Sequence, residues 1–253
     1  SLGLRSHLAN HLWRAFWDRV FAVASLLLAI VFGAALGNLI RGVPLNAEGY
    51  FFTALWTNFR PGPAPGILDW YTLLMALEGT AILTVHGAHY LVMKTDGEVQ
   101  RRARRVAELG LWVIAALTVA AILAIPVVQP GLRRNYDAHP IGYLLSLVAA
   151  GALGSLFYFR RCQHDIAAFL ASSLLILGLL GSTAWGLFPN LLISSVDPAY
   201  SLTVSNAAAS PYGLQTALVW FIVGFSLVVV YSLYVYRSFW GKVDVPSGDY
   251  GEY

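Results

Sequence analysis

The chain has 253 residues, of which 58% are apolar and only 11% charged, and its formal net charge is +3. Because soluble domains carry about 25% charged residues, this composition excludes a water-soluble globule and predicts a protein whose solvent is lipid. No basic cluster is interleaved with aromatics, which excludes nucleic acid as a partner, and the single cysteine excludes an internal disulfide and a cysteine-ligated metal cage.

Six segments are apolar nearly all round and reach the roughly 20 residues that a membrane-spanning helix needs. They cover residues 20–40, 70–93, 109–128, 141–159, 166–187 and 214–236. Asp69 stands at the N-terminal cap position of the second segment, and Ser210 precedes Pro211 at the start of the sixth. The sequence therefore predicts an all-α integral membrane protein: a bundle of six transmembrane helices forming one membrane domain over residues 1–253, with two longer loops on the outer face.

Basic residues sort unevenly when the loops are assigned alternately to the two faces of the membrane. One face holds four of them, Arg41, Arg60, Arg133 and Arg134. The other holds twelve, namely Arg5, Arg14, Arg19, Lys94, Arg101, Arg102, Arg104, Arg105, Arg160, Arg161, Arg237 and Lys242. The positive-inside rule then predicts that both termini of the chain are cytoplasmic and that the loops at 42–68, 129–140 and 188–213 lie outside.

Two polar groups lie deep in the second segment. Glu78 stands about a third of the way along it, where an ionisable side chain costs several kcal/mol unless it faces water or a partner. His86 follows at about 80° round the helix and about 12 Å along it. We expect the two to border one polar file, with Thr80 and Thr84 between them, that forms a proton path. The alternative is a protonated glutamic acid and a histidine satisfied within the bundle.

The positions of the six histidines argue against cofactor ligation by this chain. Only His86 lies well inside a predicted span, His89 stands nearer the cytoplasmic end, and the other four lie in or near loops. Bis-histidine haem ligation is therefore not expected. No His and carboxylate set has metal-ligand spacing, and no nucleophile–base pair or phosphate loop occurs. No catalytic, cofactor-binding or metal-ligating residue is predicted.

Asn38 and Arg41 close the first segment, directly before the tight exit formed by Gly42 and Pro44. Arg41 is one of the few basic residues on the outer face. We expect it either to bind an acidic group, such as a propionate or a lipid phosphate, or to compensate the helix dipole and anchor the helix at the membrane interface.

The loop at residues 188–212 carries one charge, Asp197, and no Lys or Arg. A loop this long with so little charge is expected to fold onto another surface. Asp197 before Pro198 predicts a rigid turn, and Asn206 is expected to brace the backbone by Asx-type hydrogen bonds. Together with Tyr200, these residues are predicted to be structural or interface residues rather than catalytic ones.

Four segments carry a resemblance to a known family, subunit II of the cytochrome bd-type ubiquinol oxidases, including their cyanide-insensitive relatives. They are FWDRVFAVASLL (Phe16 to Leu27), GAALGNLIRGVPL (Gly33 to Leu45), HGAHYLVMKTDGE (His86 to Glu98) and FPN…VDPAYSLTVSNAAASPYGL (Phe188 to Leu214). They follow the family's order over nearly the whole chain. The family has eight spans, and the chain resembles it without the first two helices, so proton-path carboxylates on those helices are not carried over.

The resemblance implies an accessory subunit of a respiratory quinol:oxygen oxidoreductase in the bacterial inner membrane. In such a complex the partner, subunit I, holds b-type and d-type haems and oxidises ubiquinol, and dioxygen is reduced to water with cytoplasmic protons, electrogenically and without a proton pump. This chain would ligate no haem, would not be catalytic alone, and would support subunit I within the lipid bilayer. It would contribute proton or dioxygen access routes, and a bound quinone or lipid is a further expected ligand.

Two alternatives from other classes stay open at this point. One is a small membrane transporter or channel whose polar file runs through Glu78 and His86. The other is a purely structural membrane scaffold. A transporter would keep some activity when reconstituted alone, whereas an oxidase subunit would copurify with a haem partner.

Overall fold

The structure is a computed structural model that describes residues 4 and 11–243. Arg5, which entered the count of basic residues, lies outside the described residues. The elements, in chain order, are α2 (His11–Arg41), α3 (Trp70–Lys94), α4 (Gly97–Val128), α5 (Leu132–Ala138), η1 (Pro140–Gly142), α6 (Tyr143–Cys162), α7 (Asp165–Leu187), β1 (Asn190–Leu192), η2 (Pro198–Tyr200), β2 (Leu202–Thr203) and α8 (Pro211–Ser238). Strands β1 and β2 pair antiparallel within the predicted outer loop. The described part is helical almost throughout, which confirms the predicted all-α fold class.

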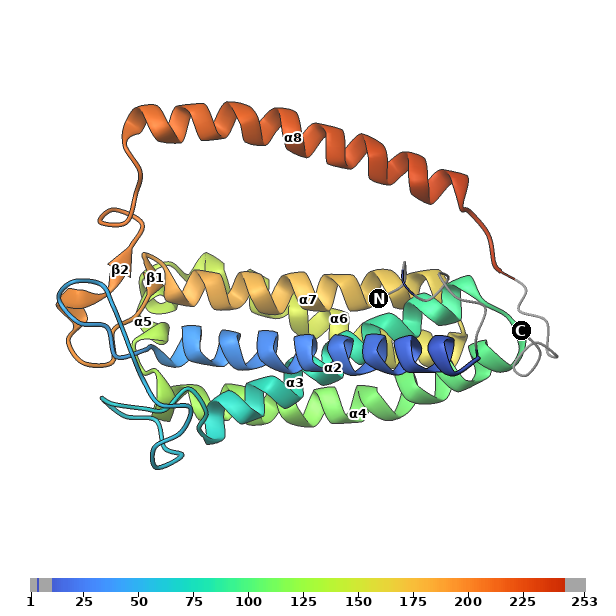
Figure 1. Cartoon of the computed structure of the whole chain (residues 1–253), viewed down its shortest axis with the longest axis horizontal. Helices are drawn as coiled ribbons and strands as arrows, with labels where there is room; N and C mark the ends of the chain where they lie inside the picture. Colours follow the sequence, from blue (N-terminus) through green and yellow to red (C-terminus); the bar gives the residue numbers. More distant parts are fainter. Residues whose placement is uncertain (1–3, 5–10, 244–253) are drawn as a thin grey trace.

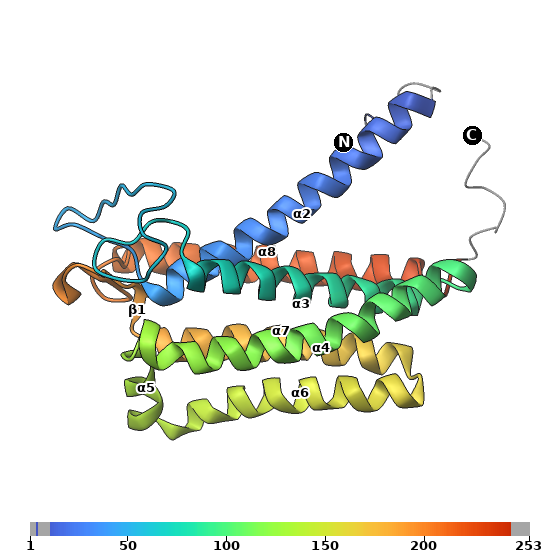
Figure 2. The same ribbon diagram turned by 90° about the horizontal axis from the view of Figure 1, so that it is seen from below.

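Helices α3, α4, α6 and α7 form the body of the molecule and run roughly parallel to one long axis (Figures 1 and 2). One buried apolar cluster, around Val85, Leu111 and Leu156, joins all four of these helices. A second, around Ile40 and Tyr71, joins α2 to α3, α4 and the start of α5. The hydrophobic core therefore lies along both faces of α3, the most central helix.

By length and composition, five of the described helices can cross a membrane: α2, α4, α6 with the preceding turn η1, α7 and α8. Helix α3 is not among them, because Glu78, His86 and His89 lower its mean hydropathy. Its 25 residues nevertheless pack against α2, α4 and α7 in the body of the bundle. The sixth predicted span thus rests on the position of α3 rather than on its composition.

Two helices extend beyond their apolar runs. Helix α4 begins at Gly97 rather than at residue 109, and α2 begins at His11 rather than at residue 20. In α4 the added turns are rich in arginine, and Glu98 pairs with Arg101 at 2.5 Å and with Arg102 at 2.9 Å. Such pairs three and four residues apart favour a helix in water, so the helix continues past the expected membrane boundary.

The two ends of the bundle differ in character. The basic end holds residues 94–105, 160–165 and 237–243, which contain most of the Lys and Arg. The loop end holds residues 42–69, 129–140 and 188–210, the long irregular segments on the other side of the helices (Figure 1). These names are kept below because the two ends carry different polar sites.

Helix α2 touches the bundle only near its loop end. A Cβ atom at Gly33 would lie 2.5 Å from the Met75 carbonyl oxygen, so the two helix backbones meet directly there. Toward its N-terminus α2 leaves the bundle at an angle, and Figure 2 shows its first half standing free of α3. The first half of α2 therefore does not pack against α3.

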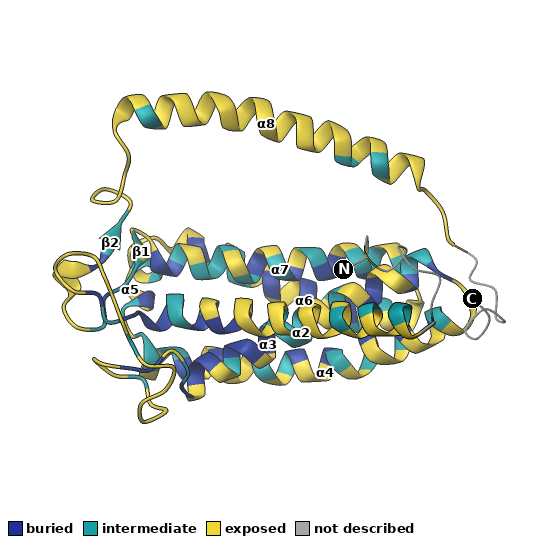
Figure 3. Ribbon diagram, viewed as in Figure 1, coloured by how far each residue is buried: buried dark blue, intermediate teal, exposed yellow. Residues whose placement is uncertain are grey.

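Helix α8 stands apart from the other helices. It contains no buried residue, and Figures 1 and 3 show it as an exposed arch separate from the body. At the basic end it is tethered, because Lys94 Nζ donates to the carbonyl oxygens of Phe239 at 2.5 Å and Gly241 at 3.2 Å, and Lys242 pairs with Asp96 at 2.9 Å. At the loop end it continues from the segment that contains β1 and β2. The helix is thus held at its ends and unpartnered along its length.

Candidate functional site

Glu78 lies on the side of α3 that packs against α4. The residue is only 4% exposed, and Thr118 Oγ1 of α4 donates a hydrogen bond of 2.8 Å to Glu78 Oε1. Among the described residues no basic side chain forms an ion pair with this carboxyl group. A charge in the membrane interior without a counter-ion costs several kcal/mol. The geometry therefore fits a neutral carboxylic acid that accepts from Thr118 and holds a proton of its own.

His86 faces a different neighbour, α7. Its Nδ1 lies 2.8 Å from Ser172 Oγ, and the single hydroxyl hydrogen of Ser172 is donated to the Phe169 carbonyl oxygen at 2.7 Å. His86 Nδ1 must then carry the hydrogen of the shared bond, which leaves Nε2 as the basic nitrogen. The ring also stacks on Phe169 with centroids 4.9 Å apart. The imidazole is held in one tautomer with a free acceptor.

The single polar file expected between Glu78 and His86 is not formed. Thr80 donates its hydroxyl to the backbone of its own helix at 2.7 Å, and Thr84 is exposed on another side of α3. Val85, only 1% exposed, lies in the apolar core between the two sites. The expectation about Thr80 and Thr84 is wrong because residues two and six positions after Glu78 point to other faces at about 100° per residue. The structure keeps Glu78 and His86 as two separate polar sites.

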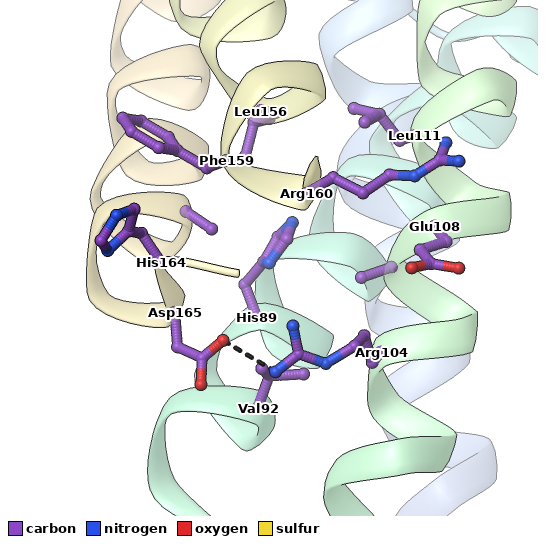
Figure 4. A pocket seen from close by; sticks show the side chains of 12 residues that line it. His89, Val92, Arg104, Glu108, Leu111, Leu156, Phe159, Arg160, His164 and Asp165 are labelled. Carbon is purple, nitrogen blue, oxygen red and sulfur yellow. Dashed lines mark hydrogen bonds and ion pairs between the residues drawn. The ribbon is translucent and has the colours of Figure 1, made fainter. Parts of the chain in front are cut away.

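His89 is the polar residue that the sequence reasoning passed over. It is 8% exposed, and its Nε2 has no hydrogen-bond partner in the described part of the chain. It follows Glu78 by slightly more than three helical turns, which places it within about 20° of the same helix face and about 16 Å along the axis. That spacing was the signal available in the sequence. The structure places His89 at a cavity near the basic end (Figure 4).

Arg41 forms a buried ion pair with Asp69, the N-terminal cap of α3. Nη1, which makes this pair, also donates to the Gly66 carbonyl oxygen at 3.0 Å, and Nη2 donates to Asn38 Oδ1 at 2.6 Å. Asn38 Nδ2 donates to the Ile67 carbonyl oxygen at 3.0 Å. Asp69 Oδ1 also accepts two backbone N–H groups of the first turn of α3 at 2.9 Å. The acidic partner of Arg41 is thus a carboxylate of its own chain, and the cluster joins α2, α3 and the loop between them.

The loop at residues 188–210 docks on the exit of α2. The Val43 N–H donates to the Ile193 carbonyl oxygen at 3.0 Å, and the Ser195 N–H donates to the Val43 carbonyl oxygen at 2.9 Å. Ser194 Oγ donates to the Leu45 carbonyl oxygen at 3.0 Å. The surface that receives this weakly charged loop is therefore the start of the loop that follows α2.

Asp197, Tyr200 and Asn206 lie within this docked loop. Asp197 Oδ1 accepts the backbone N–H two residues on at 2.8 Å and so caps η2. Asn206 Oδ1 accepts from the Thr203 N–H at 2.7 Å, and its Nδ2 donates to the Ser201 carbonyl oxygen at 2.9 Å. Tyr200 is 36% exposed. Asp197 and Asn206 thus bond to the loop's own backbone, whereas Tyr200 is available to a neighbour.

Two observations on the described residues bear on the binding of a metal ion or a haem. No group of three or more His, Cys, Asp and Glu side chains that could hold a metal occurs in residues 11–243. His86 is bonded to Ser172 and covered by Phe169, and His89 faces a cavity of about 30 Å³. A porphyrin ring is far larger than this cavity.

Known proteins resemble this chain over most of its length. The profile of the family described as "Cytochrome bd terminal oxidase subunit II" matches residues 1–239. Similar proteins include the "Probable cytochrome oxidase subunit 2" of Haemophilus influenzae, 26% identical over 95% of this chain and 69% of that protein. The "Cytochrome bd ubiquinol oxidase subunit 2" of Bacillus subtilis is 27% identical over 90% of this chain and 65% of that protein. The "Cytochrome bd-I ubiquinol oxidase subunit 2" of Escherichia coli K12 is 25% identical over 94% of this chain and 69% of that protein. The chain spans about two thirds of the length of these curated relatives.

Proposed function

The chain belongs to the cytochrome bd terminal oxidase subunit II family and is an accessory subunit of a bd-type oxidase, and we propose that it supports a haem-bearing partner subunit without ligating haem itself. The observation that carries this proposal is the setting of the two histidines of α3: His86 bonds to Ser172 and stacks on Phe169, and His89 faces a cavity of about 30 Å³. The chain serves a quinol:oxygen oxidoreductase, and the haems and the quinol substrate belong to its partner.

The free surfaces of the chain support a partner that is itself made of helices. Helix α8 buries no residue although both of its ends are tethered, and the first half of α2 diverges from the bundle (Figures 2 and 3). Helices in lipid associate through close packing rather than through the hydrophobic effect. We propose that helices of the oxidase complex pack against α8 and the diverging half of α2.

A groove between α3 and α4 is the proposed place for a bound lipid or quinone chain. It measures about 600 Å³ and is lined mainly by apolar residues, among them Leu83, Leu91 and Val106. Arg102 lies at the same groove and pairs with Glu98. The groove opens on the surface of the helices, where an acyl or isoprenoid chain from the bilayer can enter.

The charge distribution supports an orientation with the basic end in the cytoplasm. Lys and Arg residues concentrate at that end, and the positive-inside rule places such ends on the cytoplasmic side of a bacterial inner membrane. Both ends of the described chain then face the cytoplasm. Protons for oxygen reduction would approach from the basic end.

Glu78 and His86 are the proposed proton-holding groups of this subunit. Glu78 is buried, and the Thr118 hydroxyl donates to its carboxyl group. His86 keeps a basic nitrogen inside the membrane part of the chain. Ionisable groups at such depth usually mark functional paths. A transporter or channel working through the same two residues has weaker support, because the apolar core around Val85 separates them.

Copurification of the tagged chain tests this function. We expect it to bring down a haem-bearing membrane subunit and quinol oxidase activity, with haem absorbance absent from the separated chain. Stoichiometric haem bands from the separated chain would contradict the non-ligating role. Substrate transport by the chain alone in liposomes, with no haem partner in the pull-down, would favour the transporter instead.

A further inference from the structure

A small cavity at the basic end has a chemistry that the sites above do not use (Figure 4). It lies where α3, α4, α6 and the start of α7 meet. Its floor and walls are apolar, with Leu111, Leu156 and Phe159 among them. The ionisable side chains that line it are His89, Arg104, Glu108, Arg160, His164 and Asp165.

His89 is the group that points to a ligand. The residue is 8% exposed, and Figure 4 shows its ring directed into the space below Arg160. Its Nε2 is buried and has no hydrogen-bond partner among the described residues. Leaving a buried polar atom without a partner costs about 1–3 kcal/mol. A bound molecule that bonds to Nε2 would recover this free energy.

Size and charge select water as that molecule. The cavity holds about 30 Å³, and one water needs about 10–15 Å³ by the same measure, so there is room for about two. A phosphate or a carboxylate ligand would not fit. Arg104 and Asp165 pair at 2.9 Å, and Glu108 and Arg160 add one charge of each sign. The lining therefore has no excess positive charge to attract an anion.

We propose that this cavity is a water site that loads protons onto His89 from the basic end, an inference that rests on the proton-supplying role proposed above. Arg160 and His164 at the rim are exposed, so the cavity water can exchange with water outside the bundle. A hydronium ion in the cavity transfers one proton to Nε2, which forms an imidazolium and leaves a water molecule. The imidazolium then passes one proton on and returns to the neutral ring.

The next acceptor along α3 is His86, one helical turn from His89 toward the membrane interior. Its Nε2 is the basic nitrogen, because Nδ1 is committed to Ser172. The charged groups facing His89 are Arg104 and Glu108 on α4, Arg160 on α6, and His164 and Asp165 at the start of α7. Asp165 also pairs with Lys242 of the C-terminal segment, whose Nζ lies 3.9 Å from Asp165 Oδ2.

The test uses the assembled oxidase with His89→Gln, His89→Phe and the control His139→Gln, whose side chain is exposed at the loop end. We expect both His89 variants to keep their haem content, to slow quinol-driven oxygen consumption by about tenfold, and to raise the solvent deuterium isotope effect on turnover. The control should match the wild type. A purely structural role would not change the isotope effect.

Two results would overturn the inference. One is wild-type turnover and isotope effect in His89→Gln, since an amide bonds to water but does not titrate. The other, decisive if both variants fail to assemble, is a high-resolution map of the wild-type complex with a dry cavity or a partner side chain on Nε2; water density there supports the site. A wild-type complex without quinol oxidase activity would instead contradict the proposed function itself.

Discussion

Glu78 of α3 and Thr118 of α4 meet through one hydrogen bond of 2.8 Å in the buried interface of the two helices. The carboxyl group has no basic partner among the described residues, so its stability in the membrane depends on this hydroxyl and on staying neutral. A neutral acid that keeps a proton within a membrane bundle can pass it on when the local field changes. This pair is therefore the sharpest place to test proton supply by the subunit.

Glu78→Gln should slow oxygen consumption by the assembled oxidase by about tenfold. Glutamine keeps an oxygen that accepts the bond from Thr118, so we expect normal assembly and haem content. The measurement is turnover at an oxygen electrode across pH, with haem content read from the absorption spectrum. Unchanged turnover at every pH would return Glu78 to a structural role.

Thr118→Val is the variant to compare with Glu78→Gln. It keeps the carboxyl group but removes its hydrogen-bond donor, which should lower the free energy of unfolding by about 1–3 kcal/mol. A drop in the thermal midpoint without a comparable change in turnover per haem would show that the hydroxyl stabilises the acid and that the acid carries the proton.

Asp69→Asn should destabilise the protein more than any exposed ion-pair variant. Asparagine still caps α3, but Arg41 is left as an unpaired buried charge, which costs about 3–5 kcal/mol. Asp137→Asn is the matched control, because Asp137 and Arg133 pair at 3.4 Å with both side chains largely exposed. That change should cost less than about 1 kcal/mol. Equal thermal midpoints for the two variants in detergent would contradict a stabilising role of the Arg41–Asp69 ion pair.

The membrane helices were predictable because lipid imposes a strong rule on composition: a span must be long and apolar. The residues at which these helices begin were not predictable, since the arginine-rich turns of α4 are stabilised in water by pairs such as Glu98 with Arg101. Helix α3 shows the opposite limit. Its length and its N-terminal cap at Asp69 could be predicted from the sequence. Its polar residues are tolerated only because α2, α4 and α7 surround it.

The positions of the polar residues could be predicted from the sequence, but their hydrogen-bond partners could not. Depth within a span singled out Glu78 and His86, yet only packing shows that one faces Thr118 and the other Ser172. Arg41 was expected either to bind an acidic group, such as a propionate or a lipid phosphate, or to compensate the helix dipole. Its acidic partner is instead a carboxylate 28 residues later, at the cap of the next helix. Such long-range pairs follow from tertiary packing, which a single sequence does not encode locally.

Gly42→Ala should loosen the docking of the two outer loops. Gly42 has φ of +92°, and an added Cβ would lie 2.9 Å from the Ile193 carbonyl oxygen that Val43 bonds. Gly49→Ala is the control, because φ there is +77° but no atom lies within 4 Å of the added Cβ. The control carries only backbone strain of about 1–2 kcal/mol. Faster proteolysis of residues 188–210 in Gly42→Ala than in Gly49→Ala is the expected result, and equal rates would contradict it.

Gly33→Ala should separate α2 from α3 and lower the thermal midpoint of the detergent-purified protein. The added Cβ would lie 2.5 Å from the Met75 carbonyl oxygen, and because that obstacle is backbone, the helices must shift apart rather than a side chain rotate. Gly151→Ala of α6 is the control, since its Cβ meets no atom within 4 Å. Alanine favours a helix by up to about 1 kcal/mol over glycine, so the control should be unchanged or slightly stabilised. Equal changes in the thermal midpoint of the two variants would mean that α2 is held by its loop contacts and by the Arg41–Asp69 ion pair. The close approach of α2 and α3 at Gly33 would then not be what holds it.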